Sequence, residues 1–139
     1  MSGFLTRHYI DRAADFYAGS KLTQLDEHYK NSAALLAIHS AISYSDALRV
    51  GLGDLSLRAD DHKEAVTSLK RLLASKRLDN PAGYKNFEDL LSMKNRISYG
   101  SQTIDAKTSS LIATKAERFA NWVSRTARQL KLEDWSNDD

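Results

Sequence analysis

Two polar residues, His39 and Asp46, stand inside a long apolar segment and are the first candidates for chemistry. They are seven residues apart, so a helix places them two turns apart on one face. A buried carboxylate must be paired or hydrogen-bonded, and Asp46 therefore predicts a partner on a neighbouring helix, with His62, Arg96 and Tyr99 as the choices. Such residues either satisfy one another and fix the register of the helices, or they orient groups at a cleft.

Basic residues gather in three segments and form a second candidate site. They are Lys70, Arg71, Lys76 and Arg77, then Lys94 and Arg96, and finally Lys115, Arg118, Arg125 and Arg128. Arginine suits bidentate contacts with phosphate, so convergence of these side chains predicts a groove for RNA or a nucleotide. Arg118 and Arg125 share one helix face. In the alternative, the cations are simply solvated, and Lys76 and Arg77 lie at a helix C-terminus, where positive charge is favourable.

The residues present exclude several kinds of catalytic site. The 139-residue chain has no cysteine, which removes disulfides, thiolate-bound zinc, iron–sulfur clusters and a cysteine nucleophile. Its only Gly-x-Gly, in GLGD, lacks the third glycine and the Lys-Ser/Thr ending of a phosphate loop. The four histidines form neither HxxxH nor HExxH, and paired ExxH motifs are missing, so neither a metal site nor a cofactor is expected.

Helices must position these residues. One proline, six glycines and apolar residues at steps of three and four predict an all-α protein with five helices. The first helix is expected to end near Gly19 and Ser20. The second, about residues 26–50, is apolar or small on nearly every side through its middle, so it should contact several neighbours.

The remaining three helices have recognisable starts and stops. The residues that mark them are Asp61 with Glu64, Asn80–Pro81 with Gly83, Gly100, and Thr103 or Asp105. The first pair forms a capping box at the start of the third helix. The second set supplies a turn before the fourth helix, a glycine ends that helix, and the fifth helix then runs for about 25 residues. The aromatic residues lie at core spacing and are expected to pack rather than to stack on bases: Tyr9, Tyr17, Tyr29, Phe119 and Trp122.

Short connections between these helices predict a single antiparallel up-and-down bundle of four to five helices over residues 1–132. Residues 133–139 form an acidic tail that is expected to fray. Because this tail holds four of the 18 acidic residues, residues 1–132 carry 20 basic against 14 acidic groups, which is compatible with a polyanionic partner. The sequence has neither an apolar run long enough to cross a membrane nor a signal peptide, so we expect a cytoplasmic protein.

Four segments of the chain resemble the HEPN superfamily (higher eukaryotes and prokaryotes nucleotide-binding domain). They are NSAALLAIHSAISYSDALRVG, DDHKEAVTSLKRLL, LLSMKNRISYG and ATKAERFANWVSRTARQL, within about residues 25–130. The matching features are His62 at the opening of the third helix, Arg96 before Tyr99 at the end of the fourth, and the pattern Ala116, Phe119, Ala120 and Val123. The resemblance implies a four- to five-helix bundle that forms a homodimer.

Many members of this superfamily are metal-independent ribonucleases with an arginine followed, after four to six residues, by a histidine. That motif is absent here, because no histidine follows Arg96 in ISYGSQTIDAKT, and Arg58 and His62 are separated by only three residues. Tyr99 stands where non-nucleolytic branches also carry a tyrosine, whose ordinary pKa of about 10 makes it a poor general base at pH 7. The resemblance therefore implies the branch that lacks the nuclease motif.

The resulting expectation is a binding or accessory domain for RNA or a nucleotide, without nuclease activity and without cofactors. Lys94, Arg96, Tyr99 and His62 form the candidate site, with the arginine on phosphate. Two alternatives remain open: a toxin-type metal-independent ribonuclease that uses a nonstandard His62–Arg96 pair, and a purely structural protein-interaction bundle. A cognate partner protein, such as an antitoxin or a nucleotidyltransferase, is compatible with each of these functions.

Overall fold

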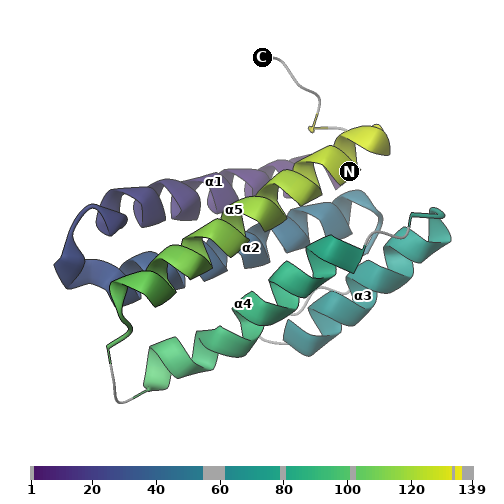
Figure 1. Cartoon of the computed structure of the whole chain (residues 1–139). Helices are drawn as coiled ribbons and strands as arrows, with labels where there is room; N and C mark the ends of the chain where they lie inside the picture. Colours follow the sequence, from purple (N-terminus) through teal and green to yellow (C-terminus); the bar gives the residue numbers. More distant parts are fainter. Residues whose placement is uncertain (1, 55–61, 79–80, 101–102, 133, 136–139) are drawn as a thin grey trace.

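The computed structural model describes residues 2–54, 62–78, 81–100, 103–132 and 134–135. These residues form an all-α bundle, as the helical spacing predicted (Figure 1). The elements are α1 (Ser2–Gln24), the short 3-10 helix η1 (Glu27–Tyr29), α2 (Lys30–Gly51), α3 (His62–Ser75), α4 (Pro81–Tyr99) and α5 (Ala106–Gln129).

Helices α1 and α2 form an antiparallel hairpin that is held together by small side chains. Ser20 donates its hydroxyl hydrogen bond to the carbonyl of Ala33 at 2.7 Å, and Ser40 donates to the carbonyl of Ala13 at 2.8 Å. All four residues are buried, so the two backbones approach closely. The predicted end of α1 near Gly19 and Ser20 is therefore wrong: the helix continues to Gln24 because Ser20 is fixed against α2.

Helix α2 is the centre of the bundle and contacts α1, α3, α4 and α5, which confirms the prediction from its apolar surface. Its start differs slightly from the expected residue 26. The side chain of Asp26 accepts a hydrogen bond from the backbone N–H of His28 and caps η1, and α2 itself begins at Lys30. Asp26 therefore still marks where helical structure resumes after α1.

The helices do not alternate strictly in direction. Helices α4 and α5 are antiparallel and are joined side by side by Asp89 and Lys115. Near the starts of α2 and α5, the Asn31 side chain accepts a hydrogen bond from the backbone N–H of Ile104 at 3.1 Å. Figure 1 shows α2, α3 and α5 running in one general direction and α1 and α4 in the other. The alternation predicted for an up-and-down bundle is thus interrupted between α2 and α3.

An aromatic cluster joins α4 to α5. Phe87 and Phe119 stack with ring centroids 4.6 Å apart, and Trp122 lies 5.7 Å from Phe119 and 5.3 Å from Tyr84. Gly83 is in the first turn of α4, not in a turn before the helix, and a Cβ atom there would lie 2.1 Å from the Trp122 ring. The absence of a side chain at this position is what lets the indole reach α4.

Several predicted boundaries are confirmed. Helix α4 ends at Tyr99, directly before Gly100. The Asp105 side chain accepts a hydrogen bond from the backbone N–H of Thr108 at 2.8 Å and caps α5. Among the predicted packing aromatics, Phe119 and Trp122 are buried, whereas Tyr29 is about half exposed. The capping residue Asp61 lies outside the described residues.

Helices α2, α3 and α5 end in the same way, with one residue in the left-handed conformation. These residues are Gly53 (φ 95°), Arg77 (φ 62°) and Lys131 (φ 57°). After α3, the N–H of Arg77 bonds to the carbonyl of Ala74, and the N–H of Leu78 bonds to that of Leu73. This is the Schellman motif, which favours glycine at the left-handed position. An arginine and a lysine hold that position in two of the three cases.

Two residues of the acidic tail, Asp134 and Trp135, contact the helices. Trp135 is only 6% exposed and its ring centroid lies 6.4 Å from that of Tyr44 on α2. Arg7 donates to the backbone carbonyl of Asp134 at 2.6 Å, and Arg128 donates to that of Trp135 at 3.4 Å. The fraying predicted for residues 133–139 stays a prediction. Across the described ranges, we find no helix with the length and apolar character needed to cross a membrane.

Candidate functional site

Two predicted binding residues, Arg96 and Tyr99, lie at the exposed end of α4. They are one helical turn apart on one face. Tyr99 is 84% exposed, the largest exposure among the bulky apolar and aromatic side chains except for Leu25. Neither side chain has a hydrogen bond or an ion pair with the described residues. Lys94, on the same helix, is half-buried.

The other predicted cations are not gathered with these residues. Arg118 and Arg125 are exposed on one face of α5. Because the Asp89–Lys115 contact sets the register of the antiparallel pair, Arg96 is level with about residue 108 of α5. Arg118 and Arg125 are therefore displaced by roughly 15 and 25 Å along the helix, at 1.5 Å per residue. His62 begins α3, but its side chain lies outside the described part, so its predicted contact with Arg96 stays a prediction.

Asp46 has a different partner from those predicted. Its carboxylate lies 3.7 Å from the guanidinium of Arg49, one turn further along α2, and not beside a residue of α3 or α4. The predicted partner on a neighbouring helix is wrong because Asp46 is on the side of α2 that faces α1, near Tyr9 and Arg12. His39 is half-buried on this side too, with its ring 5.5 Å from that of Phe16 on α1. Both polar residues thus belong to the α1–α2 contact.

Burial raises the pKa of Asp46 from its ordinary value of 3.8 to about 6, against the opposing charges of Arg49 and Arg12. The folded protein therefore binds more protons than the unfolded chain between about pH 4 and pH 6. As the pH rises through that window, the contribution of Asp46 to the free energy of unfolding falls. The side chain is 21% exposed, and its charge also raises the pKa of Tyr9, behind the larger effect of burial on that phenol.

Asp46→Asn is expected to raise the free energy of unfolding at pH 7.5 by about 1–2 kcal/mol, because the neutral amide removes the charge that burial disfavours. At pH 4.5 the two proteins should differ much less, since the native carboxyl is then mostly protonated. Urea denaturation of both proteins at the two pH values measures this difference. An equal gap at both pH values would show that Asp46 does not titrate in this range.

The strongest buried polar contact was not predicted. Arg49 is 2% exposed, and its Nε and Nη2 atoms each lie 3.0 Å from Oδ2 of Asp54, which is 8% exposed. The same oxygen accepts a hydrogen bond of 2.6 Å from the hydroxyl of Ser68 on α3. These contacts to a single carboxylate oxygen tie the end of α2 to α3. Their only sequence signal was a basic and an acidic residue on either side of the helix-ending Gly53.

A surface cavity of about 750 Å³ lies between α3 and α4 and is the second candidate site. Its lining is Lys70, Ala74, Arg77, Leu78, Tyr84, Lys85 and Glu88. Lys70 and Arg77 are among the basic residues of the sequence, and the position of Arg77 near a helix C-terminus predicted a solvated charge rather than a site. The other lining residues had no signal of their own, because the cavity depends on how two helices pair.

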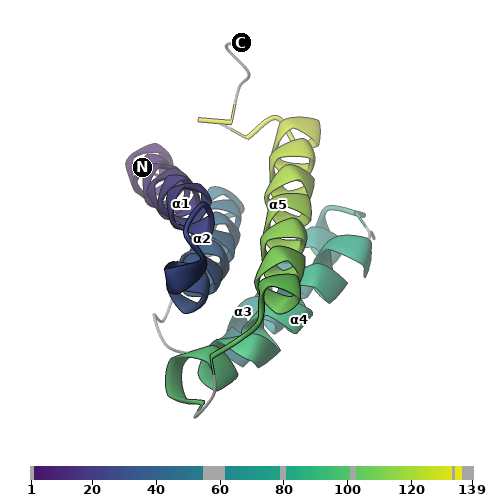
Figure 2. The same ribbon diagram turned by 60° about the vertical axis from the view of Figure 1, so that its left-hand side comes forward.

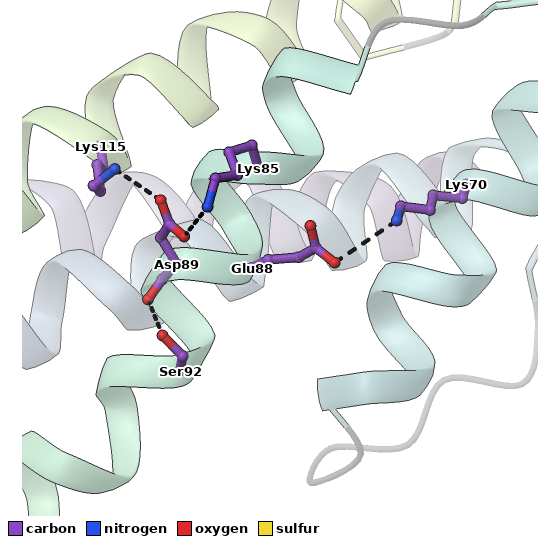
Figure 3. A network of polar contacts seen from close by, with 6 residues as sticks. All are labelled: Lys70, Lys85, Glu88, Asp89, Ser92 and Lys115. Carbon is purple, nitrogen blue, oxygen red and sulfur yellow. Dashed lines mark hydrogen bonds and ion pairs between the residues drawn. The ribbon is translucent and has the colours of Figure 1, made fainter.

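Ion pairs join α4 to the helices on either side of it near this cavity (Figure 3). Lys70 lies 3.7 Å from Glu88 and 5.5 Å above the ring centroid of Tyr84. Asp89 accepts from Lys85 at 2.9 Å and from Lys115 at 2.8 Å, and these hydrogen bonds lower the pKa of its carboxyl. Among the described residues no acceptor is paired with the guanidinium of Arg77.

The arrangement does not suggest metal chemistry. Within the described ranges, no group of three histidine, aspartate or glutamate side chains is placed to hold an ion. What the two candidate sites share is unpaired or weakly paired cations together with aromatic side chains, which suits anionic ligands. Compared with known proteins, the sequence matches no protein-family model and no curated protein.

Proposed function

We propose that this protein is a non-catalytic binding domain for single-stranded RNA or a nucleotide, of the HEPN type. The observation that carries the proposal is the pair Arg96 and Tyr99, which project side by side into solvent from the end of α4. An exposed arginine supplies a phosphate contact, and an exposed aromatic ring supplies a face on which a base stacks.

The exposed face of α4 supports a role for a strand rather than for a single phosphate. Lys85, Glu88, Ser92, Arg96 and Tyr99 follow one another at steps of three and four, so they share one side of the helix. This stripe leads from the cavity between α3 and α4 to Tyr99. A single strand that lies along this stripe would contact Lys85 at one end, and Arg96 and the ring of Tyr99 at the other.

Arg96→Ala and Tyr99→Ala are each expected to weaken binding of a labelled single-stranded RNA by roughly 5- to 100-fold. A stacked base contributes about 1–3 kcal/mol to binding, and we expect a similar contribution from a phosphate contact. Arg96→Ala should also reduce the slope of log K against log salt by about one. Fluorescence anisotropy at three salt concentrations measures both quantities.

Arg12→Ala is the matched control, because Arg12 is an exposed arginine on α1. It should leave the affinity unchanged. The RNA should stay intact during incubation with EDTA, since the nuclease motif is missing. Equal affinities of the Arg96, Tyr99 and Arg12 variants would contradict the proposed surface, and cleavage in EDTA that the Arg96 variant lacks would favour the ribonuclease alternative instead.

A further inference from the structure

We infer that the cavity between α3 and α4 is a binding site for a phosphate monoester, either a small free ester or the terminal phosphate of a nucleic-acid strand. The inference goes beyond the proposed function, because it assigns a second site that shares only Lys85 and Glu88 with the stripe on α4 and does not include Arg96 or Tyr99. It depends on the charge and the size of the cavity, which are independent observations.

The charge of the lining suits a dianion. Three cations, Lys70, Arg77 and Lys85, line the cavity together with one carboxylate, that of Glu88. Lys70 is held by Glu88 only at 3.7 Å, and Arg77 has no acceptor in the described part of the chain. The ammonium of Lys85 is bonded to Asp89, which also accepts from Lys115 (Figure 3). The positive charge open to a ligand is therefore that of Arg77, with Lys70 beside it. A phosphate monoester, with its second pKa at about 6, is mostly a dianion at pH 7.

The size and the apolar wall of the cavity call for more than a bare phosphate ion. A volume of about 750 Å³ is in the range of small-molecule sites and exceeds what one phosphate group needs. Ala74, Leu78 and the buried ring of Tyr84 contribute apolar surface. An organic group attached to the phosphate would cover this surface while the cations hold the oxygens.

The backbone at Arg77 allows binding to be tested without loss of stability. Its φ of 62° is the left-handed conformation that ends α3, a position at which glycine is the residue of lowest strain. Lys131 holds the same conformation after α5, so the strain by itself does not mark a site. Arg77 differs from Lys131 in that it lines the cavity.

Glu88 competes with an anionic ligand for Lys70. Its carboxylate lies 3.7 Å from the Lys70 ammonium and lines the same cavity (Figure 3). A bound phosphate would be repelled by this charge and would have to share the lysine with it. Removing the charge while keeping the shape, as in Glu88→Gln, should therefore tighten binding, whereas most substitutions at a merely structural residue would not.

The experiment uses the full chain and measures binding by calorimetry with AMP, adenosine and inorganic phosphate as probes. AMP should bind more tightly than either of the other two. Arg77→Gly should weaken AMP binding by about tenfold or more, because a charge-assisted contact is lost. The same substitution should raise the melting temperature by about 2–4 °C, since glycine relieves the left-handed strain. Lost binding in a more stable protein excludes unfolding as the cause.

Lys131→Gly is the matched control, because Lys131 holds the equivalent left-handed position after α5. It should raise the melting temperature to a similar degree and leave AMP binding unchanged. Glu88→Gln should tighten AMP binding by about three- to tenfold. AMP that binds no better than adenosine, or an Arg77→Gly protein that binds AMP as the parent does, would overturn the inference.

Two further arms separate the sources of the ligand and the two proposals. A preference for a 5′-phosphorylated over a 5′-hydroxyl RNA, lost in Arg77→Gly, identifies the strand end as the ligand, and AMP binding without that preference identifies a free ester. Arg12→Ala, at an exposed arginine of α1 outside both proposed surfaces, should leave AMP binding unchanged. If Arg96→Ala leaves the affinity for RNA unchanged while Arg77→Gly abolishes AMP binding, the phosphate site in the cavity is supported and the proposed RNA surface on α4 is contradicted.

Discussion

Asp54→Ala is expected to lower the free energy of unfolding by about 3–5 kcal/mol, a large part of the stability of a domain of this size. The substitution leaves the guanidinium of Arg49, which is 2% exposed, without the carboxylate that two of its nitrogens contact. It also leaves the hydroxyl of Ser68 without its acceptor. Asp46, at 3.7 Å, is too distant to replace the lost contacts. Urea denaturation followed by circular dichroism measures the loss.

Glu117→Ala is the control for this result. It removes a carboxylate that lies 3.5 Å from Lys21, but both side chains of that pair are about half exposed. Its cost should stay at or below about 1 kcal/mol, as for other exposed ion pairs. Replacing both partners, as in Arg49→Met with Asp54→Ala, should be less harmful than the sum of the single changes, since neither the Arg49 guanidinium nor the Asp54 carboxylate is left buried without the other. Similar losses in the free energy of unfolding for Asp54→Ala and Glu117→Ala would show that burial does not account for the stabilisation by the Arg49–Asp54 contact.

Gly83→Ala is expected to destabilise the protein by about 2–4 kcal/mol, although alanine is the better helix former by about 1 kcal/mol. The added Cβ atom would stand 2.1 Å from one carbon of the Trp122 indole and 2.3 Å from another. Trp122 is buried between Tyr84 and Phe119, so its ring cannot withdraw without disturbing both. Thermal and urea unfolding measure the change.

Gly19→Ala tests the same exchange where there is more room. Its Cβ atom would lie 3.3 Å from one methyl group of Leu36, which is a flexible contact, so the effect should be close to neutral. A second comparison uses a smaller ring: Gly83→Ala in a Trp122→Phe background should cost at least 1 kcal/mol less than in the parent chain. If Gly83→Ala instead stabilises the protein, the close approach of Trp122 to α4 is not the dominant effect at this position.

Local signals predicted the helices well where the backbone alone sets them. Asp105 caps α5 and Gly100 follows α4 because these residue types satisfy or end helical backbone in any context. The same kind of local signal predicted a helix end at Ser20. Its hydroxyl instead donates a hydrogen bond to the carbonyl of Ala33 on another helix, and α1 continues. Trp135 shows the same limit, because its contact with Tyr44 on α2 had no signal in the acidic residues around it.

The candidate sites depend on pairings that periodicity does not contain. The family resemblance named Arg96 and Tyr99 as binding residues, but their spacing did not show that both are exposed at the end of α4. Nor did spacing show that Asp46 turns towards α1, or that Asp54 meets Ser68 across an interhelical contact. The cavity was missed for the same reason: Lys70 is on α3 and Arg77 follows the end of that helix, but only the position of α4 brings Lys85 and Glu88 opposite them.

The two indoles of this chain give it two separate optical reporters. Trp122 is enclosed by the rings that join α4 to α5, whereas Trp135 lies beside Tyr44 on α2. Figure 2 shows α1 and α2 together to the left of α5. With Trp122 replaced by phenylalanine, the remaining tryptophan emission follows only the region where Trp135 packs against α2. Comparing it with the emission of the parent reveals whether the α3–α4 pair loosens before the α1–α2 hairpin or together with it.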